Sequence, residues 1–200
     1  MRVMNAKMPG GFIGVITTFL AAVTLVVRTH TEDLPAPLRL TAWAVNMSNI
    51  ATGANATVDI SIDRWSSEAE RQRLRTAFVE KGPDKLLDIL QDMPRVGYIR
   101  LPTTVGYDLH FARQVPLDEG GQRIIIATDR RIGFAEARNQ PRTMDYPFTL
   151  IEIRLHPDGT GEGKMSIATK VSFNKKQNVV ELENYASEPV RLQNVKLEKQ

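Results

Sequence analysis

The chain contains no cysteine, which excludes disulfide bonds, thiolate nucleophiles and cysteine-ligated metal sites. Its folded part must therefore be stable through a hydrophobic core alone. Histidine is also scarce, because His30, His110 and His156 are the only ones and lie far apart in the sequence. A three-histidine metal site has little support, so we predict neither a bound metal nor a cofactor.

The sequence signatures of several common enzyme classes are missing. There is no G-x-S-x-G nucleophile elbow, no P-loop, no H-E-x-x-H and no G-x-G-x-x-G. A strong excess of positive charge is missing too, since 26 basic residues against 23 acidic ones give a net charge of +3. Arg2 and Lys7 precede the first acid, Glu32, so from Arg28 onward 24 basic residues face 23 acidic ones, a net +1. We therefore expect no nucleic-acid partner.

A long run of apolar and weakly polar residues lies near the N-terminus, where the uncharged segment Phe12–Val27 follows Arg2 and Lys7 and meets Arg28. A basic tip before such a run is typical of a secretory signal segment. As a helix the run would span about 24 Å, at about 1.5 Å per residue, against a bilayer core of about 30 Å. A cleaved signal is therefore favoured over an uncleaved membrane anchor. Both alternatives predict export to a bacterial periplasm or cell envelope, with membrane contact only through residues 12–27 if they are retained.

The remainder is typical of one domain. We divide the chain into a leader at 1–28, a linker at 29–38 that carries Pro35 and Pro37, and a single β-rich domain at 39–200. Alternation of apolar and polar residues predicts nine strands, which are Leu38–Met47, Ala54–Asp63, Val96–Leu101, Gly106–Val115, Arg123–Asp129, Pro147–His156, Gly161–Phe173, Asn178–Asn184 and Pro189–Glu198.

The connections between these strands are mostly short and carry Pro, Gly, Asp or Asn. Short connections favour an antiparallel meander, and such a sheet must close or pair to protect its edges. We therefore expect a mainly β fold, α+β by content, of about eight or nine strands. A β-barrel is preferred over a β-sandwich.

Two helices are predicted after the second strand. Ser67 and Glu70 form an S-x-x-E capping box, which satisfies free amide donors at a helix start. This helix runs to about Glu80, Gly82 ends it, and Pro83 can open a second short helix. The apolar stripes that we expect to be buried are Leu74, Ala77 and Phe78 in the first helix and Leu86, Leu87, Leu90 and Met93 in the second. We interpret the pair as an insertion rather than a separate domain.

Large aromatic residues are few, at 6% of the chain. The two tryptophans, Trp43 and Trp65, flank the first predicted hairpin. We expect them to pack in the core or at its rim rather than to form platforms for sugars.

The connection Asp129–Tyr146 is the unusual one, since loops longer than about 12 residues in a compact domain are usually functional or disordered. Its arginines match carboxylates and phosphates, so they are suited to an anionic ligand. Alternatively they pair with nearby acids and hold the loop over the barrel mouth. The candidate ligand-binding residues are Arg130, Arg131, Glu136, Arg138, Arg142, Asp145 and Tyr146.

The predicted strand that contains Asp108 and His110 offers weaker, catalytic candidates. An Asp and a His two positions apart on a strand can form an orienting pair for base catalysis or metal binding. No third partner is evident, and a solvent-facing pair is the simpler interpretation. Strict alternation would place Tyr107, Leu109 and Phe111 on one face and Asp108, His110 and Ala112 on the other.

Three segments carry a resemblance: Arg95–Arg100 (RVGYIR), Ala127–Glu152 (ATDRRIGFAEARNQPRTMDYPFTLIE) and Glu181–Lys196 (ELENYASEPVRLQNVK). In them the chain resembles a set of uncharacterised exported bacterial β-rich proteins with no established activity. The similarity covers about residues 40–200. It implies a bacterial, exported, single-domain protein and assigns no catalytic residue.

Three functions stay open. The first is a non-enzymatic envelope protein that binds a small or anionic ligand, or a partner protein, through loop 129–146. It needs an apolar cavity with arginines at its rim. The second is an accessory or structural subunit of a membrane-associated complex, which needs a filled barrel and an exposed apolar patch of more than a few hundred Å². The third is a hydrolase that uses Asp108, His110 and loop acids. It needs one of these two residues within about 3–4 Å of a loop acid or arginine inside a cavity.

Overall fold

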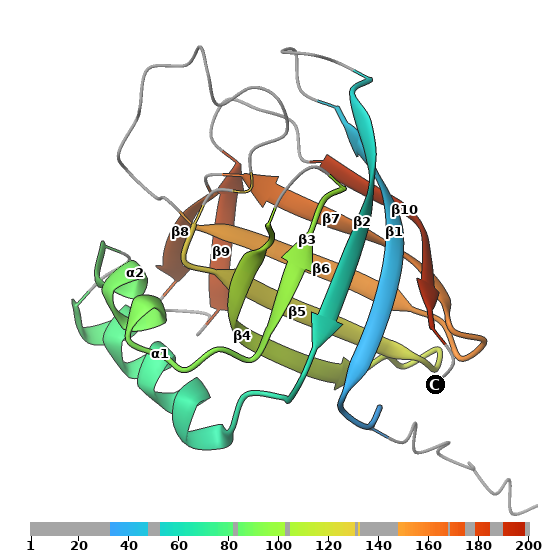
Figure 1. The fold of residues 1–200 in the computed structure, drawn as a ribbon. Helices are drawn as coiled ribbons and strands as arrows, with labels where there is room; N and C mark the ends of the chain where they lie inside the picture. The colour runs from blue at the N-terminus through green and yellow to red at the C-terminus, as the bar shows by residue number, and fades with distance from the viewer. Residues whose placement is uncertain are drawn as a thin grey trace, which may run out of the picture.

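A closed β-barrel of eight antiparallel strands forms the centre of the fold, with two helices against one wall and a two-stranded sheet beside it (Figure 1). This barrel with its two-helix insertion after the second strand confirms the predicted fold class, and the barrel is the form adopted rather than the sandwich. The computed structural model describes residues 33–47, 53–81, 84–102, 105–130, 132, 148–167, 169–174, 179–184 and 190–198.

The predicted leader lies outside the described residues. Within them, none of the helices has the length and apolar character that a membrane-spanning helix needs.

The strands follow one another around the barrel in the order β1-β10-β7-β6-β5-β4-β3-β2. Each neighbouring pair is antiparallel. The order places β5 four positions from β1 in either direction, so these two strands lie on opposite walls. Their bounds are β1 Leu38–Asn46, β2 Asn55–Ile62, β3 Gly97–Arg100, β4 Tyr107–Pro116, β5 Gln122–Thr128, β6 Thr149–Leu155, β7 Thr160–Ile167 and β10 Val190–Leu197.

The predicted strand Gly161–Phe173 is in fact two strands in two sheets. Its barrel part, β7, ends at Ile167, which pairs with the first residue of β6, Thr149. On the other side, β10 begins opposite Met165. Beyond these points the barrel offers no pairing partner, so the chain continues as β8 (Thr169–Asn174) and pairs with β9 (Val179–Asn184) in a separate sheet.

The barrel interior is filled by one apolar cluster. Along β1 the alternation is regular, with Leu40 and Ala42 inside and Arg39 outside. On β7 the inward position Gly163 carries no side chain, and a Cβ there would come within 2.6 Å of the Glu152 carbonyl oxygen of β6. The largest fully buried side chains of this interior include Leu40, Ile60, Ile62, Ile99, Leu109, Ile124, Ile126, Ile151 and Ile153.

Two helices, α1 (Glu68–Lys81) and α2 (Asp84–Gln91), cover the outer face of the wall opposite β1 (Figure 1). The predicted capping box is confirmed, because the Glu70 amide donates to Ser67 Oγ (3.2 Å) and the Ser67 amide donates to Glu70 Oε2 (2.7 Å). The predicted stripes also pack as expected. They form a second cluster in which Phe78, Leu90 and Met93 are buried with the barrel residues Ala127 and Phe148.

Trp65 joins the start of this insertion to the segment before β1. Its indole N–H donates to the carbonyl oxygen of Leu34 (2.8 Å), which also accepts from the side chain of Gln114 (3.1 Å). Trp65 is partly buried against the core, as predicted. Trp43 differs, since it is 41% exposed on the outer face of β1. The expected packing role is therefore wrong for Trp43, because the odd-numbered positions of β1 face outward and neither of the two described helices covers them.

Candidate functional site at the root of the long loop

A β-bulge in β4 sets the position of His110. The pairing of β4 with β5 shifts between Leu109 and Phe111, which leaves His110 as an extra residue without a partner across the sheet. As a result, Leu109 and Ala112 both point into the barrel, although they are three positions apart. Phe111 packs against the helices instead. The predicted faces are wrong at Phe111 and Ala112, because strict alternation holds only for a strand without a bulge.

His110 joins the end of α2 to the end of β5. Its Nδ1 lies 2.9 Å from the carbonyl oxygen of Met93, in the turn after α2. Its Nε2 lies 3.6 Å from Asp129 Oδ1, and the two side chains are only 13% and 14% exposed. A carbonyl only accepts hydrogen bonds, so Nδ1 carries a proton. The separation between Nε2 and the Asp129 carboxylate is longer than a direct hydrogen bond.

Asp129 also contacts the first arginine of the long loop. Its Oδ2 lies 3.7 Å from Nε of Arg130, whose side chain is 74% exposed. One carboxylate is thus shared between a nearly buried imidazole and an exposed guanidinium. Of the candidate residues predicted in this loop, Arg130 belongs to the described part of the chain. The others, Arg131, Glu136, Arg138, Arg142, Asp145 and Tyr146, lie outside the described residues.

Two buried threonines hold the backbone at this point. Thr128 and Thr149 are both fully buried, and both hydroxyl groups donate to the carbonyl oxygen of Arg130, at 2.5 Å and 3.0 Å. The Thr149 hydroxyl also accepts from the amide of Ile132 (3.0 Å). Sequence reasoning missed these residues. The sequence did carry a signal for them, because a threonine stands at the end of the strand before the loop and another at the start of the strand after it. A threonine hydroxyl in such a position can form a hydrogen bond with the nearby backbone.

Asp108 is not brought together with His110. It is exposed on the outer surface, where its Oδ1 lies 3.5 Å from Nε of Arg95. Arg95 also contacts Asp63 (3.5 Å), and its guanidinium lies over the ring of Tyr98, 5.4 Å from the centroid. Asp129, the first residue after the neighbouring strand β5, therefore takes the place beside His110 that the sequence assigned to Asp108.

This arrangement is poorly suited to base catalysis by His110. In a catalytic triad one ring nitrogen faces the orienting acid and the other faces the nucleophile. Here the other nitrogen faces a backbone carbonyl, so neither is open to a substrate proton. The separation between His110 and a loop acid meets the distance expected for the hydrolase alternative, but the hydrogen bonding gives the pair a structural role. Among the described side chains, no group of three or more His, Asp or Glu could hold a metal ion.

Arg130 is the group at this site that is open to a ligand. Its backbone is fixed by two threonines, its guanidinium is mostly in solvent, and its ion pair with Asp129 is long. An arginine held in this way can accept a carboxylate or phosphate in its fork. Comparisons with protein-family models, with curated proteins and with solved structures each find no match, so a functional assignment rests on this geometry.

Proposed function

We propose that this protein is a non-enzymatic binding protein whose filled barrel is a rigid scaffold, and that it takes a small anionic ligand at the root of loop 129–146. The observation that carries the proposal is the position of Arg130. Its backbone carbonyl is held by two buried hydroxyl groups, and its guanidinium is 74% exposed beside one carboxylate that is shared with His110.

The filled interior supports a site on the outside of the barrel. Ile124, Ile151 and Ile153 are fully buried in the middle of the interior cluster, where a ligand would have to displace them. Removing such side chains from a core costs about 2–5 kcal/mol each, so displacement is unfavourable. The ligand site that was expected in a cavity at the barrel mouth is accordingly proposed at the outer root of the loop.

The other two functions have less support. A docking subunit should expose a large contiguous apolar patch. Among the described residues the exposed large hydrophobic side chains are Trp43, Val79 and Val105, which lie on β1, on α1 and ahead of β4. The hydrolase alternative lacks a free base at His110. Export to a bacterial periplasm or envelope remains part of the proposal and depends on the N-terminal pattern alone.

Amide chemical shifts of the full chain during titration with inorganic phosphate, and separately with citrate, test the proposal. Shifts are expected at residues 129–132 and should disappear in Arg130→Ala. Arg154→Ala is the matched control, because Arg154 is also exposed and also has a long contact to a neighbouring acid, Glu152 (3.9 Å). Equal loss in both variants, or no response at residues 129–132, would refute the proposed site.

A further inference from the structure

A second β-bulge lies on the wall opposite the helices. The pairing of β10 with β7 shifts between Leu192 and Val195, which leaves Asn194 in the extra position. Asn194 has φ +50°, a left-handed conformation that asparagine tolerates better than most residues. On the other side of β10, the pairing with β1 skips Ala42. Bulges often lie beside functional sites, where they redirect a side chain.

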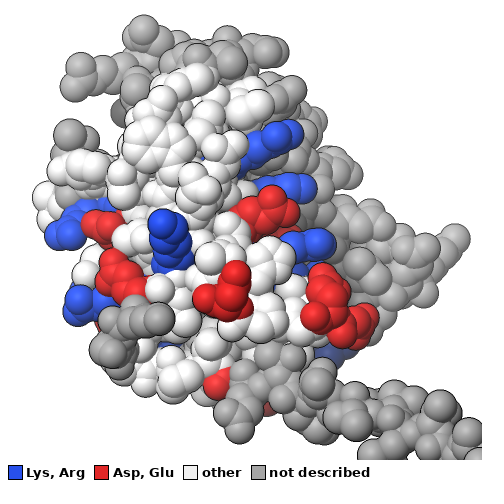
Figure 2. All heavy atoms as spheres, turned by 90° about the vertical axis from the view of Figure 1, so that its right-hand side faces the viewer, with Lys and Arg blue, Asp and Glu red and all other residues white. Residues whose placement is uncertain are grey.

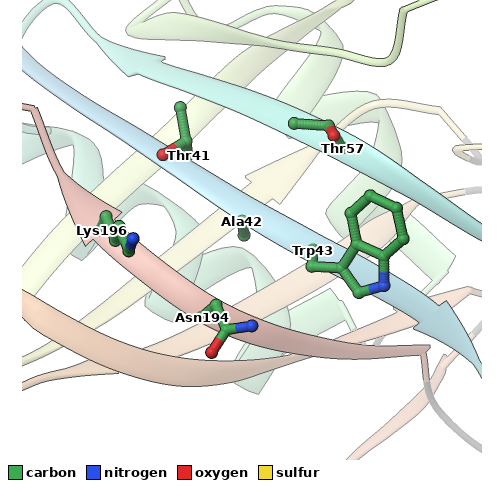
Figure 3. Close-up of a pocket in the computed structure, with 6 residues that line it drawn as sticks. All are labelled: Thr41, Ala42, Trp43, Thr57, Asn194 and Lys196. Atoms are coloured by element: carbon green, nitrogen blue, oxygen red, sulfur yellow. The ribbon is translucent and has the colours of Figure 1, made fainter.

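A hollow of about 340 Å³ opens at this bulge, lined by Thr41, Ala42, Trp43, Thr57, Asn194 and Lys196 (Figure 3). This volume is at the lower end of small-molecule sites, which are about 300–1,000 Å³. The indole of Trp43 leans across β1 toward Thr57, its register partner on β2. An exposed indole offers a large flat apolar surface with a polar N–H at one edge, which suits a ligand that has both apolar and polar faces.

The polar groups around the indole are available for a ligand. Within the described residues, the side chains of Thr41, Thr57, Asn194 and Lys196 form no hydrogen bond or ion pair with one another or with a neighbour. The two hydroxyl groups and the amide both donate and accept, and the ammonium group donates. The hollow therefore offers an apolar surface with several unused hydrogen-bonding groups at its edge.

Two cations flank Trp43 along the wall. Thr41 pairs with Lys196 and Val45 pairs with Arg191, so an exposed positive side chain lies on β10 on either side of Trp43. Residues two apart on a strand are separated by about 7 Å, which puts roughly 13 Å between the two positions. A single ring cannot reach both cations, whereas a short chain of rings can.

Two acids lie near these cations, and one of them is already paired with an arginine. Asp59 on β2 is the register partner of Thr41 on β1, but its carboxylate forms an ion pair with Arg100 (3.1 Å). Glu162 is an exposed acid on β7 opposite the bulge, so a carboxylate of the ligand has to lie on the Lys196 side of the hollow, away from it. Figure 2 views the side of β1 and β10 and shows charges of both signs around a largely uncharged area.

We propose that this hollow binds an acidic oligosaccharide. The C–H face of one sugar ring lies on the Trp43 indole, and the ring carboxylate is bonded to Lys196. Thr41, Thr57 and Asn194 bond to ring hydroxyl groups, and a second acidic ring reaches Arg191. A simple aromatic acid would also stack on the indole, but it would leave the hydroxyl and amide groups unmatched. This site is on the opposite wall from Arg130 and does not depend on the function proposed there.

Isothermal titration calorimetry of the full chain with trigalacturonic acid tests the proposal, with maltotriose as the neutral trisaccharide and benzoate as the aromatic acid. Trigalacturonic acid should bind, and its affinity should fall with added salt. Trp43→Ala and Lys196→Met should each weaken binding about tenfold or more, a loss of about 1.4 kcal/mol. Both side chains are exposed, so thermal melting should show that both variants fold.

The Arg130→Ala variant tests whether trigalacturonic acid binds at this hollow rather than at the root of loop 129–146. This variant should bind trigalacturonic acid with the same affinity as the unmodified chain. Failure of the unmodified chain to bind trigalacturonic acid would overturn the proposal. Equal affinity for maltotriose, binding of benzoate alone, or unchanged affinity in Trp43→Ala would overturn it as well.

Discussion

His110 contacts Asp129, which directly follows the neighbouring strand β5, rather than Asp108 of its own strand, and its Nε2 lies 3.6 Å from the Asp129 carboxylate. The bulge in β4 makes this possible, because the extra residue turns the imidazole toward the end of β5 and the turn after α2. The same carboxylate then reaches Arg130. The contact therefore links the helical insertion, the barrel wall and the start of the long loop.

Replacing His110 by alanine should destabilise the fold by about 1–3 kcal/mol. The Met93 carbonyl oxygen would lose its donor, and Asp129 would keep a nearly buried carboxylate with one partner fewer. Urea unfolding measures the difference. His156→Ala is the control, because His156 is exposed in a turn, and its effect should stay within about 0.5 kcal/mol. Equal effects of the two variants would contradict the linking role.

The contact between Arg64 and Glu70 predicts a loss of stability in acid. The Arg64 guanidinium donates two hydrogen bonds to the Glu70 carboxylate, and with the Ser67 amide it lowers the pKa of Glu70 from 4.5 to about 2. Because the folded-state pKa lies below the unfolded value, this contribution is complete above about pH 4.5. It is lost as the pH falls toward 2.

The expected size of this effect is about 1 kcal/mol, since the Arg64 side chain is 39% exposed and solvent screens the pair. Glu70→Gln keeps a side chain that suits the capping box and removes the titration. Urea unfolding between pH 2 and pH 6 should show the unmodified chain losing its advantage over Glu70→Gln across this window. A constant difference between the two proteins at all these pH values would count against the assignment.

Thr149→Val should destabilise the barrel by about 1–3 kcal/mol, although valine has nearly the same shape. The amide of Ile132 would lose its acceptor in a buried position. Hydrogen exchange at the Ile132 amide should accelerate, while Thr57→Val, on the exposed face of β2, should leave stability and exchange nearly unchanged. Unaltered exchange at Ile132 would show that the hydroxyl does not hold this backbone.

Replacing Arg138 and Arg142 together by alanine tests the two roles that the sequence allows for the loop. If these arginines help to hold an anion, phosphate or citrate binding should weaken by about tenfold while the melting temperature stays within about 2 °C. A large fall in melting temperature with binding retained would instead favour arginines that pin the loop to the barrel.

The local patterns of the chain predicted its elements well. The S-x-x-E box marks the start of α1, and the spacing of Leu74 and Phe78 marks the face that packs on the barrel. These signals are local, because a cap and a helical stripe involve residues within a few positions of one another. The strand bounds follow for the same reason, since turn residues interrupt an alternation that is itself local.

Only the tertiary structure decided where the pairing between two strands shifts by one residue. The residue that bulges, whether His110 or Asn194, depends on which partner positions are taken on both sides of its strand. The division of β7 from β8 follows from where β6 and β10 happen to begin. The amino-acid sequence by itself determined the two helices, most of the strands and their apolar faces away from the bulges. Only the closed barrel decided which polar side chains meet, because pairing between distant strands has no signature within either strand.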